Sequence, residues 1–196
     1  CILVTGFPTS PDEGTYTVIP YDQDAAKEYL SKSNYDGREL QIYVISGSTP
    51  EKVAQIVQGQ LAEVGIKVAV VPCDTATFNA AQRGVTADMM IYDNTNVWFD
   101  FCNPGASYNP DMEKTYTPDK YFEGYQTLKD YYAKIATEMD PVARKQLMAD
   151  LMSYSNENAY QIGLYAGVSA VAYNKDLTGI VASPVSDFYI SKLSWK

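Results

Sequence analysis

Residues 89–105, MMIYDNTNVWFDFCNPG, place one carboxylate among large aromatic side chains directly after an apolar, strand-like run. Asp100 is that carboxylate, and its aromatic neighbours are Tyr92, Trp98, Phe99 and Phe101. A carboxylate in apolar surroundings is costly unless a cation or hydrogen-bond donors meet it. Aromatic rings around one acid are suited to bind an organic cation or an amine. The alternative is an aromatic mini-core under a loop, which needs no ligand.

The same segment holds oxygen-bearing side chains of the kind that bind metal ions, namely Asp93, Asn94, Asn96 and Asp100. A calcium loop of the EF-hand kind needs oxygen ligands at alternate positions followed by glycine, and counting from Asp93 does not give that pattern. We therefore interpret these residues as an Asx-rich turn that follows a strand. The sequence predicts neither a metal nor a cofactor.

Catalysis has little support in the residue types. The chain contains no histidine, which removes the commonest general base and the commonest metal ligand. Asp88, Asp93 and Asp100 supply carboxylates, but nothing in their spacing holds two of them at a separation useful for hydrolysis. The glycines form neither a P-loop nor a GxGxxG motif. We expect a protein that is not an enzyme.

The charge balance excludes some partners. The chain has 15 basic and 24 acidic residues, a net charge of −9, and so is a poor partner for nucleic acid or an anionic membrane surface. Cys1, Cys73 and Cys102 form no CxxC pair; a bridge between the last two stays open, although buried free thiols are favoured. Cys1 begins an apolar, β-like run, so we expect the chain to be a fragment of a longer protein.

The elements that must position residues 89–105 begin with a helix. Residues 21–34 predict a short helix capped by Asp22 or Asp24, and residues 39–45 predict a strand. Thr49 is the expected cap of a second helix. This helix has one apolar face and ends at Gly65; the face carries Val53, Ile56, Val57, Leu61 and Val64.

A strand over residues 66–72 completes a βαβ unit, whose two strands should be parallel. A helix capped by Asp74 or Thr75 and a strand over 87–92 follow. A longer helix is expected from Thr117, with an inward stripe of Tyr121, Tyr125, Leu128, Tyr132, Ile135 and Met139.

Asp140 and Pro141 open a last helix, with Leu147, Met148, Leu151 and Met152 facing inward. Residues 160–165, 168–174 and 187–193 predict further strands. The fold class is α/β. In open α/β sheets, ligands bind at the carboxyl ends of strands, which is where Tyr92 and the residues after it would lie.

The order of several stretches resembles the extracellular solute-binding proteins of family 5, the peptide/nickel class of ABC transporters. The stretches are YDQDAAKEYLSKSNYDGRELQIYVISG, AQIVQGQLAEVGIKVAVVPCDTATFNA, ADMMIY, MDPVARKQLMADLMSYSNENAYQIGLY and VAYNKDLTGI. The resemblance implies a type II periplasmic-binding-protein-like lobe, with a mixed sheet, a parallel βαβ core and flanking helices. It divides the chain into a lead-in (1–20), the C-terminal lobe (21–184) and a tail that crosses towards another lobe (185–196).

The same resemblance implies the capture of peptides for a membrane permease by a monomer outside the cell, in the periplasm or on the surface as a lipoprotein. In the family, an Asp within an Asp-aromatic-x-x-Pro pattern pairs with the amino terminus of the ligand. Residues 100–104 match this pattern, so the resemblance assigns that role to Asp100. Asp93 is the competing residue for the same role. A nickel complex, a sugar, an opine, or a sensory or regulatory role of the domain remain alternatives. The missing histidine weakens nickel, because the chain offers no imidazole.

Overall fold

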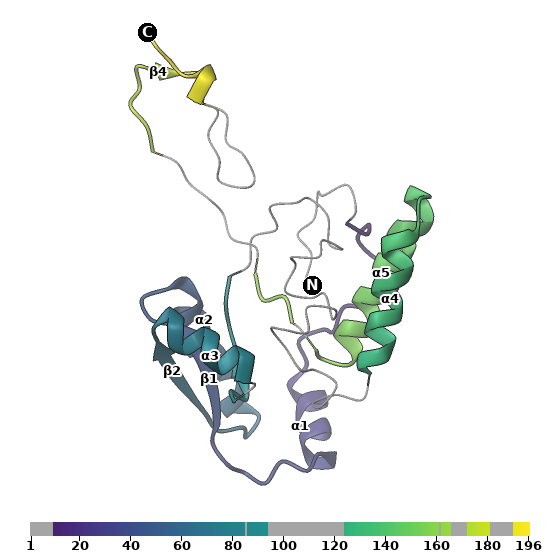
Figure 1. The fold of residues 1–196 in the computed structure, drawn as a ribbon. Helices are drawn as coiled ribbons and strands as arrows, with labels where there is room; N and C mark the ends of the chain where they lie inside the picture. Colours follow the sequence, from purple (N-terminus) through teal and green to yellow (C-terminus); the bar gives the residue numbers. More distant parts are fainter. Residues whose placement is uncertain (1–9, 85, 94–123, 161, 166–171, 181–189) are drawn as a thin grey trace. The chain divides into compact units, whose positions relative to one another are not determined.

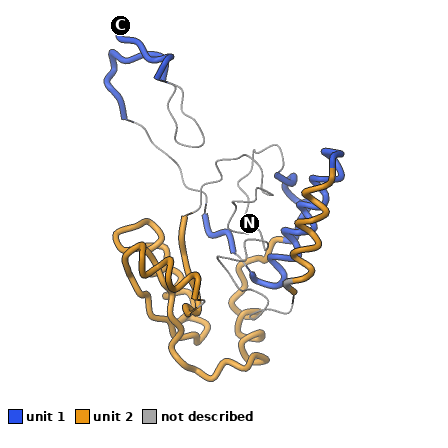
Figure 2. The backbone as a smooth tube through the Cα atoms, in the orientation of Figure 1, with its two compact units in different colours: residues 1–17, 95–101, 139–196 blue, residues 18–94, 102–138 orange. Residues whose placement is uncertain are grey.

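The computed structural model describes residues 10–84, 86–93, 124–160, 162–165, 172–180 and 190–196. The chain divides into two compact units (Figure 2). We call residues 18–94 and 102–138 the sheet unit. We call residues 1–17, 95–101 and 139–196 the α5 unit.

A three-stranded parallel sheet is the centre of the sheet unit (Figure 1). Its strands are β1 (Leu40–Ile45), β2 (Val68–Cys73) and β3 (Met89–Met90), in the order β2-β1-β3. Helix α2 (Thr49–Glu63) joins β1 to β2, and α3 (Thr75–Gly84) joins β2 to β3. The predicted α/β class and the parallel βαβ unit are confirmed. The third strand is shorter than the predicted 87–92.

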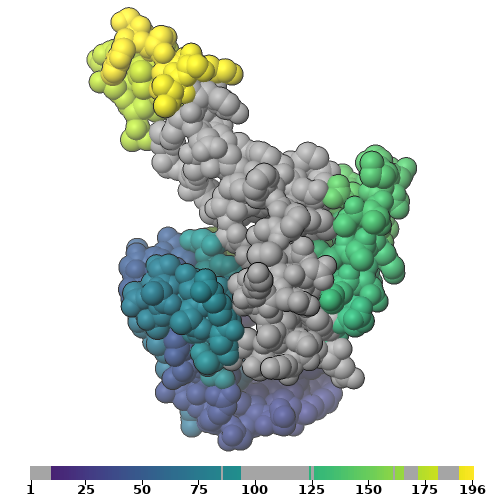
Figure 3. Space-filling view, viewed as in Figure 1, coloured from purple at the N-terminus to yellow at the C-terminus, as the bar shows by residue number. Residues whose placement is uncertain are grey.

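The two connecting helices cover opposite faces of this sheet. Ile42 and Val44 of β1 are fully buried in one cluster with Ala54 of α2. Phe78 of α3 contacts the ring of Tyr92, which strand alternation places on the other face from Ile91. Right-handed crossovers to β2 on one side and β3 on the other give this arrangement. Figure 3 shows the blue and teal atoms of these elements as one closely packed block.

Local capping signals locate the helix ends well. Helix α1 (Gln23–Lys32) begins after Asp22, whose carboxylate accepts a hydrogen bond of 2.9 Å from the Ala25 N–H. Helix α2 begins one residue before the prediction, because Ser48 rather than Thr49 has the extended backbone and accepts from the Glu51 N–H. It ends at Glu63, and Gly65, the residue after the C-cap, has a φ of 95°, in the left-handed region that glycine favours.

The apolar face predicted for α2 is wrong at one position. Ile56 is 61% exposed, whereas Ala54 is fully buried in the core. Ile56 stands two residues after Ala54, roughly 200° around the helix, so it faces away from the sheet when Ala54 packs on it.

Helix α4 (Tyr125–Thr137) contains the buried side chains of Tyr132 and Ile135, as predicted. The expected start at Thr117 and the side chain of Tyr121 lie outside the described residues. Met139 was predicted to extend the buried stripe, but it is 90% exposed. The helix has already ended at Thr137, so the helical spacing no longer applies.

Helix α5 (Pro141–Glu157) is the main element of its unit, and the predicted cap and core are confirmed. Asp140 accepts from the N–H groups of Val142 and Ala143, and Met148, Leu151 and Met152 are buried. Thr17 lies against this helix. Its N–H donates to Ser153 Oγ at 2.9 Å, and its carbonyl oxygen accepts from Asn156 Nδ2 at 2.7 Å. The lead-in residues are thus tied to α5 by both backbone polar groups of one residue.

The strands predicted near the end of the chain are wrong where the structure describes them. Residues 160, 162–165 and 172–174 form no strand, and Ile190–Lys192 form a 3-10 turn. The observed strands are instead β4 (Leu177–Thr178) and β5 (Ser194–Trp195), which pair antiparallel. The apolar residues in these segments resembled those of strands, but whether a short segment pairs as a strand is decided by partners elsewhere in the chain.

Replacing Gly179 by Ala should open the β4–β5 pair. Gly179 has a φ of 78°, and a Cβ atom there would lie 1.7 Å from the Lys192 carbonyl oxygen. We expect the variant to lose about 1–3 kcal/mol of local stability, because the backbone at Gly179 or Lys192 must shift to make room for the added Cβ atom. The measurement is hydrogen exchange at the Lys196 amide, which donates to the Asp176 carbonyl oxygen at 2.8 Å.

The matched control is Gly59→Ala on α2, where an added Cβ meets nothing within 4 Å. Alanine should stabilise this helical position by about 0.5–1 kcal/mol. Unchanged exchange at Lys196 in the Gly179→Ala variant would contradict the expected clash.

Candidate functional site

The carboxyl edge of the parallel sheet is the candidate site. Three segments leave the sheet there: Ser46 to Ser48 after β1, Asp74 after β2, and Tyr92 with Asp93 after β3. The strand order puts β1 between β2 and β3, with α2 and α3 on opposite faces. In the order β2-β1-β3, the strand order reverses between β1 and β3, and ligands of open α/β sheets bind at such points.

The turn after β1 uses its own backbone donors. The Ser46 N–H donates to the Cys73 carbonyl oxygen at 2.9 Å, and the Gly47 N–H donates to Glu51 Oε2 at 2.6 Å. Ser48 Oγ accepts from the Glu51 N–H, which caps α2. The first turn of α2 is therefore already supplied with a carboxylate, so it offers little to an anionic ligand.

Asp74 has the same role at the start of α3. Its carboxylate accepts from the Thr77 N–H at 2.8 Å and from Thr77 Oγ1 at 3.2 Å. These hydrogen bonds hold the pKa of the Asp74 carboxyl below its ordinary value. Cys73, directly before it, has a free thiol whose pKa is raised by burial. Cys102 lies outside the described residues.

Tyr92 and Asp93 lie where the sequence predicted them, directly after the third strand. The Ile91 N–H donates to the Tyr43 carbonyl oxygen at 3.2 Å, so the chain leaves the sheet at Tyr92. The rings of Tyr92 and Phe78 are 6.0 Å apart at an angle of 69°, an edge-to-face contact. This contact favours the mini-core interpretation for Tyr92, whereas Asp93 is exposed.

The remaining predicted ligand residues lie outside the described residues: Asn94, Asn96, Trp98, Phe99, Asp100 and Phe101. Their roles stay predictions. Within the described part of the chain, no three His, Cys, Asp or Glu side chains are grouped so as to hold a metal ion.

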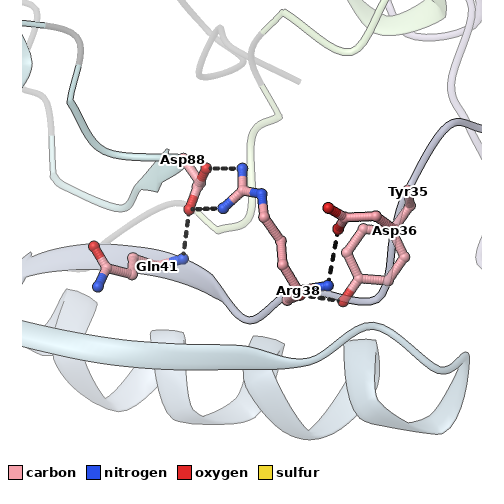
Figure 4. A network of polar contacts seen from close by, with 5 residues as sticks. All are labelled: Tyr35, Asp36, Arg38, Gln41 and Asp88. Atoms are coloured by element: carbon pink, nitrogen blue, oxygen red, sulfur yellow. Dashed lines mark hydrogen bonds and ion pairs between the residues drawn. The ribbon is translucent and has the colours of Figure 1, made fainter.

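Asp88 and Asp93, whose spacing gave no reason to expect a carboxylate pair, are not brought together in the structure. Asp88 precedes β3 and Asp93 follows it, so the two lie at opposite edges of the sheet. Asp88 instead forms a two-pronged contact with Arg38: Nη1 is 3.0 Å from Oδ2 and Nη2 is 2.5 Å from Oδ1 (Figure 4).

Sequence analysis missed this pair. A signal was present, because Arg38 stands just before one predicted strand (39–45) and Asp88 at the start of another (87–92). Parallel neighbours begin at the same edge, so opposite charges before their first residues can meet. The guanidinium holds the pKa of the Asp88 carboxyl below its ordinary value, chiefly by hydrogen bonding.

The lowered pKa of Asp88 predicts a stability change in acid. An ordinary Asp has a pKa of about 3.9 in the unfolded chain, and the pKa of Asp88 is lower in the folded chain. Its contribution is therefore complete above the unfolded pKa and is lost as the pH falls through the folded pKa. Asp88→Asn should flatten the fall of the unfolding free energy between about pH 5 and pH 2.

Urea unfolding at a series of pH values would measure this. The control is Asp24→Asn, which removes an exposed carboxylate on α1 and should leave the acid slope closer to that of the unmodified chain. If Asp88→Asn and the unmodified chain lose stability in parallel down to pH 2, the pair does not shift the titration.

A model of the bacterial extracellular solute-binding proteins, family 5 Middle, matches residues 2–147 of the chain. The chain belongs to this family. No curated protein matches it at a significant level. Among the described residues, no helix is both long and apolar enough to cross a bilayer.

Solved structures agree with the family 5 assignment at the level of the fold. NikA from Brucella suis, solved with Fe(III)-EDTA, is 18% identical over the whole chain with a TM-score of 0.71. A dipeptide-binding protein from Pseudoalteromonas sp. SM9913, solved with Met-Leu, is 17% identical over the whole chain with a TM-score of 0.65.

A third structure is a periplasmic oligopeptide-binding protein from Thermotoga maritima with bound mannohexaose, at 19% identity over 81% of the chain and a TM-score of 0.60. The family 5 chain described here spans only 42%, 39% and 33% of these three proteins. It has the fold of part of a periplasmic binding protein.

Proposed function

We propose that this chain is part of the substrate-binding component of an ABC importer, which captures peptides outside the cell and delivers them to membrane permease subunits. The observation that carries the proposal is the family 5 match over residues 2–147. A protein that only hands a ligand to a permease needs no catalysis, and we propose that it is a monomer without enzymatic activity. Attachment to the cell surface as a lipoprotein belongs to the same proposal.

The chemistry of the carboxyl edge supports a ligand group that is positive or neutral. The first turns of α2 and α3 receive their own carboxylates, Glu51 and Asp74, and Asp93 adds an exposed third. A phosphate or carboxylate ligand would meet these negative charges, whereas an ammonium group would be attracted. The free amino terminus of a peptide is such a group, and Asp100 or Asp93 is the proposed acceptor.

The peptide backbone would be held by strand-like hydrogen bonds, which accept any side chain. Sugars are the second candidate. The bound mannohexaose in a protein described as oligopeptide-binding shows that this fold holds an oligosaccharide in at least one relative. Aromatic residues such as Trp98 and Phe101 would suit sugar rings as well as an amine.

Native mass spectrometry of the full-length protein, purified without unfolding, tests the proposal directly. We expect a co-purified mass that matches short peptides. A thermal-shift comparison of peptides, oligosaccharides and a nickel complex should raise the melting temperature with peptides only; at a hundredfold excess over Kd, binding adds about 2.7 kcal/mol. Stabilisation by oligosaccharides alone would replace the peptide proposal with the sugar candidate.

A further inference from the structure

The hydrogen-bonded ladder of strand β3 is too short to set the register of the strand by itself. Only two of its residues pair with β1, in the register Ile42 with Met89 and Tyr43 with Met90. The register of a strand is set by its paired length and its buried face, and a slip of one residue moves every side chain to the other face. Met89 and Ile91 pack against the core cluster and hold β3 by its buried face, and a contact beside the strand can add to this.

The Asp88 carboxylate supplies an additional tie just before the strand. The Leu40 N–H points to β2, where it donates to the Lys67 carbonyl oxygen at 2.9 Å. The next N–H, that of Gln41, points the other way and donates to Asp88 Oδ2 at 2.9 Å (Figure 4). A side chain here takes the place that a strand carbonyl would have in a longer ladder.

Arg38 fixes the direction of that carboxylate. Both carboxylate oxygens accept from its guanidinium, and such planar two-pronged pairs define orientation as well as distance. The Arg38 backbone is held in turn, because its N–H donates to Asp36 Oδ1 at 2.9 Å and its carbonyl oxygen accepts from Tyr35 Oη. The guanidinium is thus presented from a turn that is itself ordered (Figure 4).

Tyr35 has the corresponding role on the other side of β1. Its hydroxyl oxygen accepts from the Lys67 N–H at 3.1 Å, just before β2 begins. The amino edge of the sheet is therefore tied on both sides by side chains: Tyr35 ties β2 and Asp88 ties β3. Tyr35→Phe also removes the bond from Tyr35 Oη to the Arg38 carbonyl oxygen, but it leaves the Arg38 guanidinium and the Asp88 carboxylate in place, so it is a partial control.

We propose that the Arg38–Asp88 pair is a positioning device for Tyr92 and Asp93, the two candidate ligand residues that follow β3. It sets the register of β3, and so determines that Tyr92 meets Phe78 and that Asp93 is the next residue at the carboxyl edge. A slip of one residue would move this segment by about 3.3 Å and present a neighbour in place of Tyr92. The consequence for ligand binding rests on the proposed function, whereas the register does not.

The register is tested in the 196-residue chain by hydrogen exchange and by the nuclear Overhauser contact between the Tyr92 and Phe78 rings. In Asp88→Asn and in Arg38→Gln, we expect the Ile91 amide to exchange at least roughly tenfold faster and the ring contact to weaken. Tyr35→Phe should speed exchange at Lys67 and should change both readouts at β3 less than Arg38→Gln does. Arg38→Lys keeps the positive charge but cannot form the two-pronged contact, so it should preserve the slow Ile91 exchange and the ring contact only in part.

Unchanged Ile91 exchange and an unchanged ring contact in Arg38→Gln would overturn the proposal, even if Asp88→Asn failed to fold. The proposal would also be overturned if Tyr35→Phe disturbed β3 equally, because the effect would then be general loss of stability. The contact between the Tyr92 and Phe78 rings distinguishes a shift of register from a loss of stability. A loss of stability elsewhere in the sheet does not change the distance between the two rings.

A binding arm in the full-length protein tests the consequence for the ligand. The quantity is the ratio of affinities for a free-amine peptide and its N-acetylated form. Asp88→Asn should lower this ratio by roughly tenfold, and Tyr35→Phe should change it less. A preserved ratio in Asp88→Asn would overturn the role in ligand positioning. If the unmodified protein binds neither peptide, the proposed function fails, and exchange at Ile91 still decides the register.

Discussion

In the full-length protein, replacing Asp100 by Asn should weaken the binding of peptides with a free amino terminus by on the order of a hundredfold or more. The sequence places this carboxylate among Trp98, Phe99 and Phe101, which would shield a bound ammonium from water. Removing one partner of a desolvated charge pair costs about 3–5 kcal/mol, and each about 1.4 kcal/mol is tenfold in affinity. Asparagine keeps the shape of the side chain, so the change isolates the charge.

N-acetylation of the peptide removes the same interaction from the other side. Acetylated peptides should bind weakly to the unmodified protein and should lose little further affinity in Asp100→Asn. Two changes that remove one shared interaction are not additive, so calorimetry on the four combinations gives a coupling free energy. A coupling near zero would show that Asp100 does not meet the amine.

Asp93 is the alternative acceptor, and Asp93→Asn is the matched variant. It lies at the carboxyl edge of the sheet and is exposed in the structure. If Asp100→Asn leaves the affinity unchanged while Asp93→Asn lowers it, the acceptor is Asp93. If neither change matters, the ligand has no amine at this place, and the peptide proposal gives way to a neutral ligand such as a sugar.

Replacing Ile42 by Ala should give the largest loss of stability in the sheet unit. Ile42 is fully buried in the centre of β1, in a cluster with Val44, Ala54 and Val68. The removed methyl and methylene groups lose their transfer free energy, and the cavity that remains loses packing contacts. Substitutions of this kind cost about 2–5 kcal/mol. Urea unfolding followed by circular dichroism measures the change.

Two variants bracket this result. Ile42→Val removes a single methylene from the same place and should cost about 0.5–1.5 kcal/mol. Ile56→Ala makes the same kind of truncation on α2 at a side chain that is 61% exposed, and should stay within about 0.5 kcal/mol. Equal losses for Ile42→Ala and Ile56→Ala would mean that α2 packs through a different face from the one observed.

Short-range signals made the sheet unit predictable from the sequence. Asp22 and Gly65 mark helix ends through contacts within a few residues, so their effect does not depend on the rest of the fold. The parallel pairing of β1 and β2 followed from the short joins on both sides of α2. The position of Tyr92 and Asp93 after β3 followed from the same connectivity.

Features that depend on distant partners could not be predicted in this way. The exposure of Ile56 depends on which face of α2 packs against the sheet, and the spacing of the apolar residues placed Ile56 on that face. Arg38 meets Asp88 across 50 positions of sequence. The strands β4 and β5 are each two residues long, so neither shows a period that sequence analysis can detect.

The contact between Thr17 and α5 has a consequence for how the protein is made. Thr17 and its partners Ser153 and Asn156 are separated by 136 and 139 positions. A ribosome adds about 5–20 residues per second, so Thr17 leaves the site of synthesis roughly 7–27 seconds before Ser153 exists. The sheet residues 40–93 are all synthesised within that interval. The strands of the parallel sheet can therefore pair in the nascent chain before α5, the helix that binds the lead-in, has been synthesised.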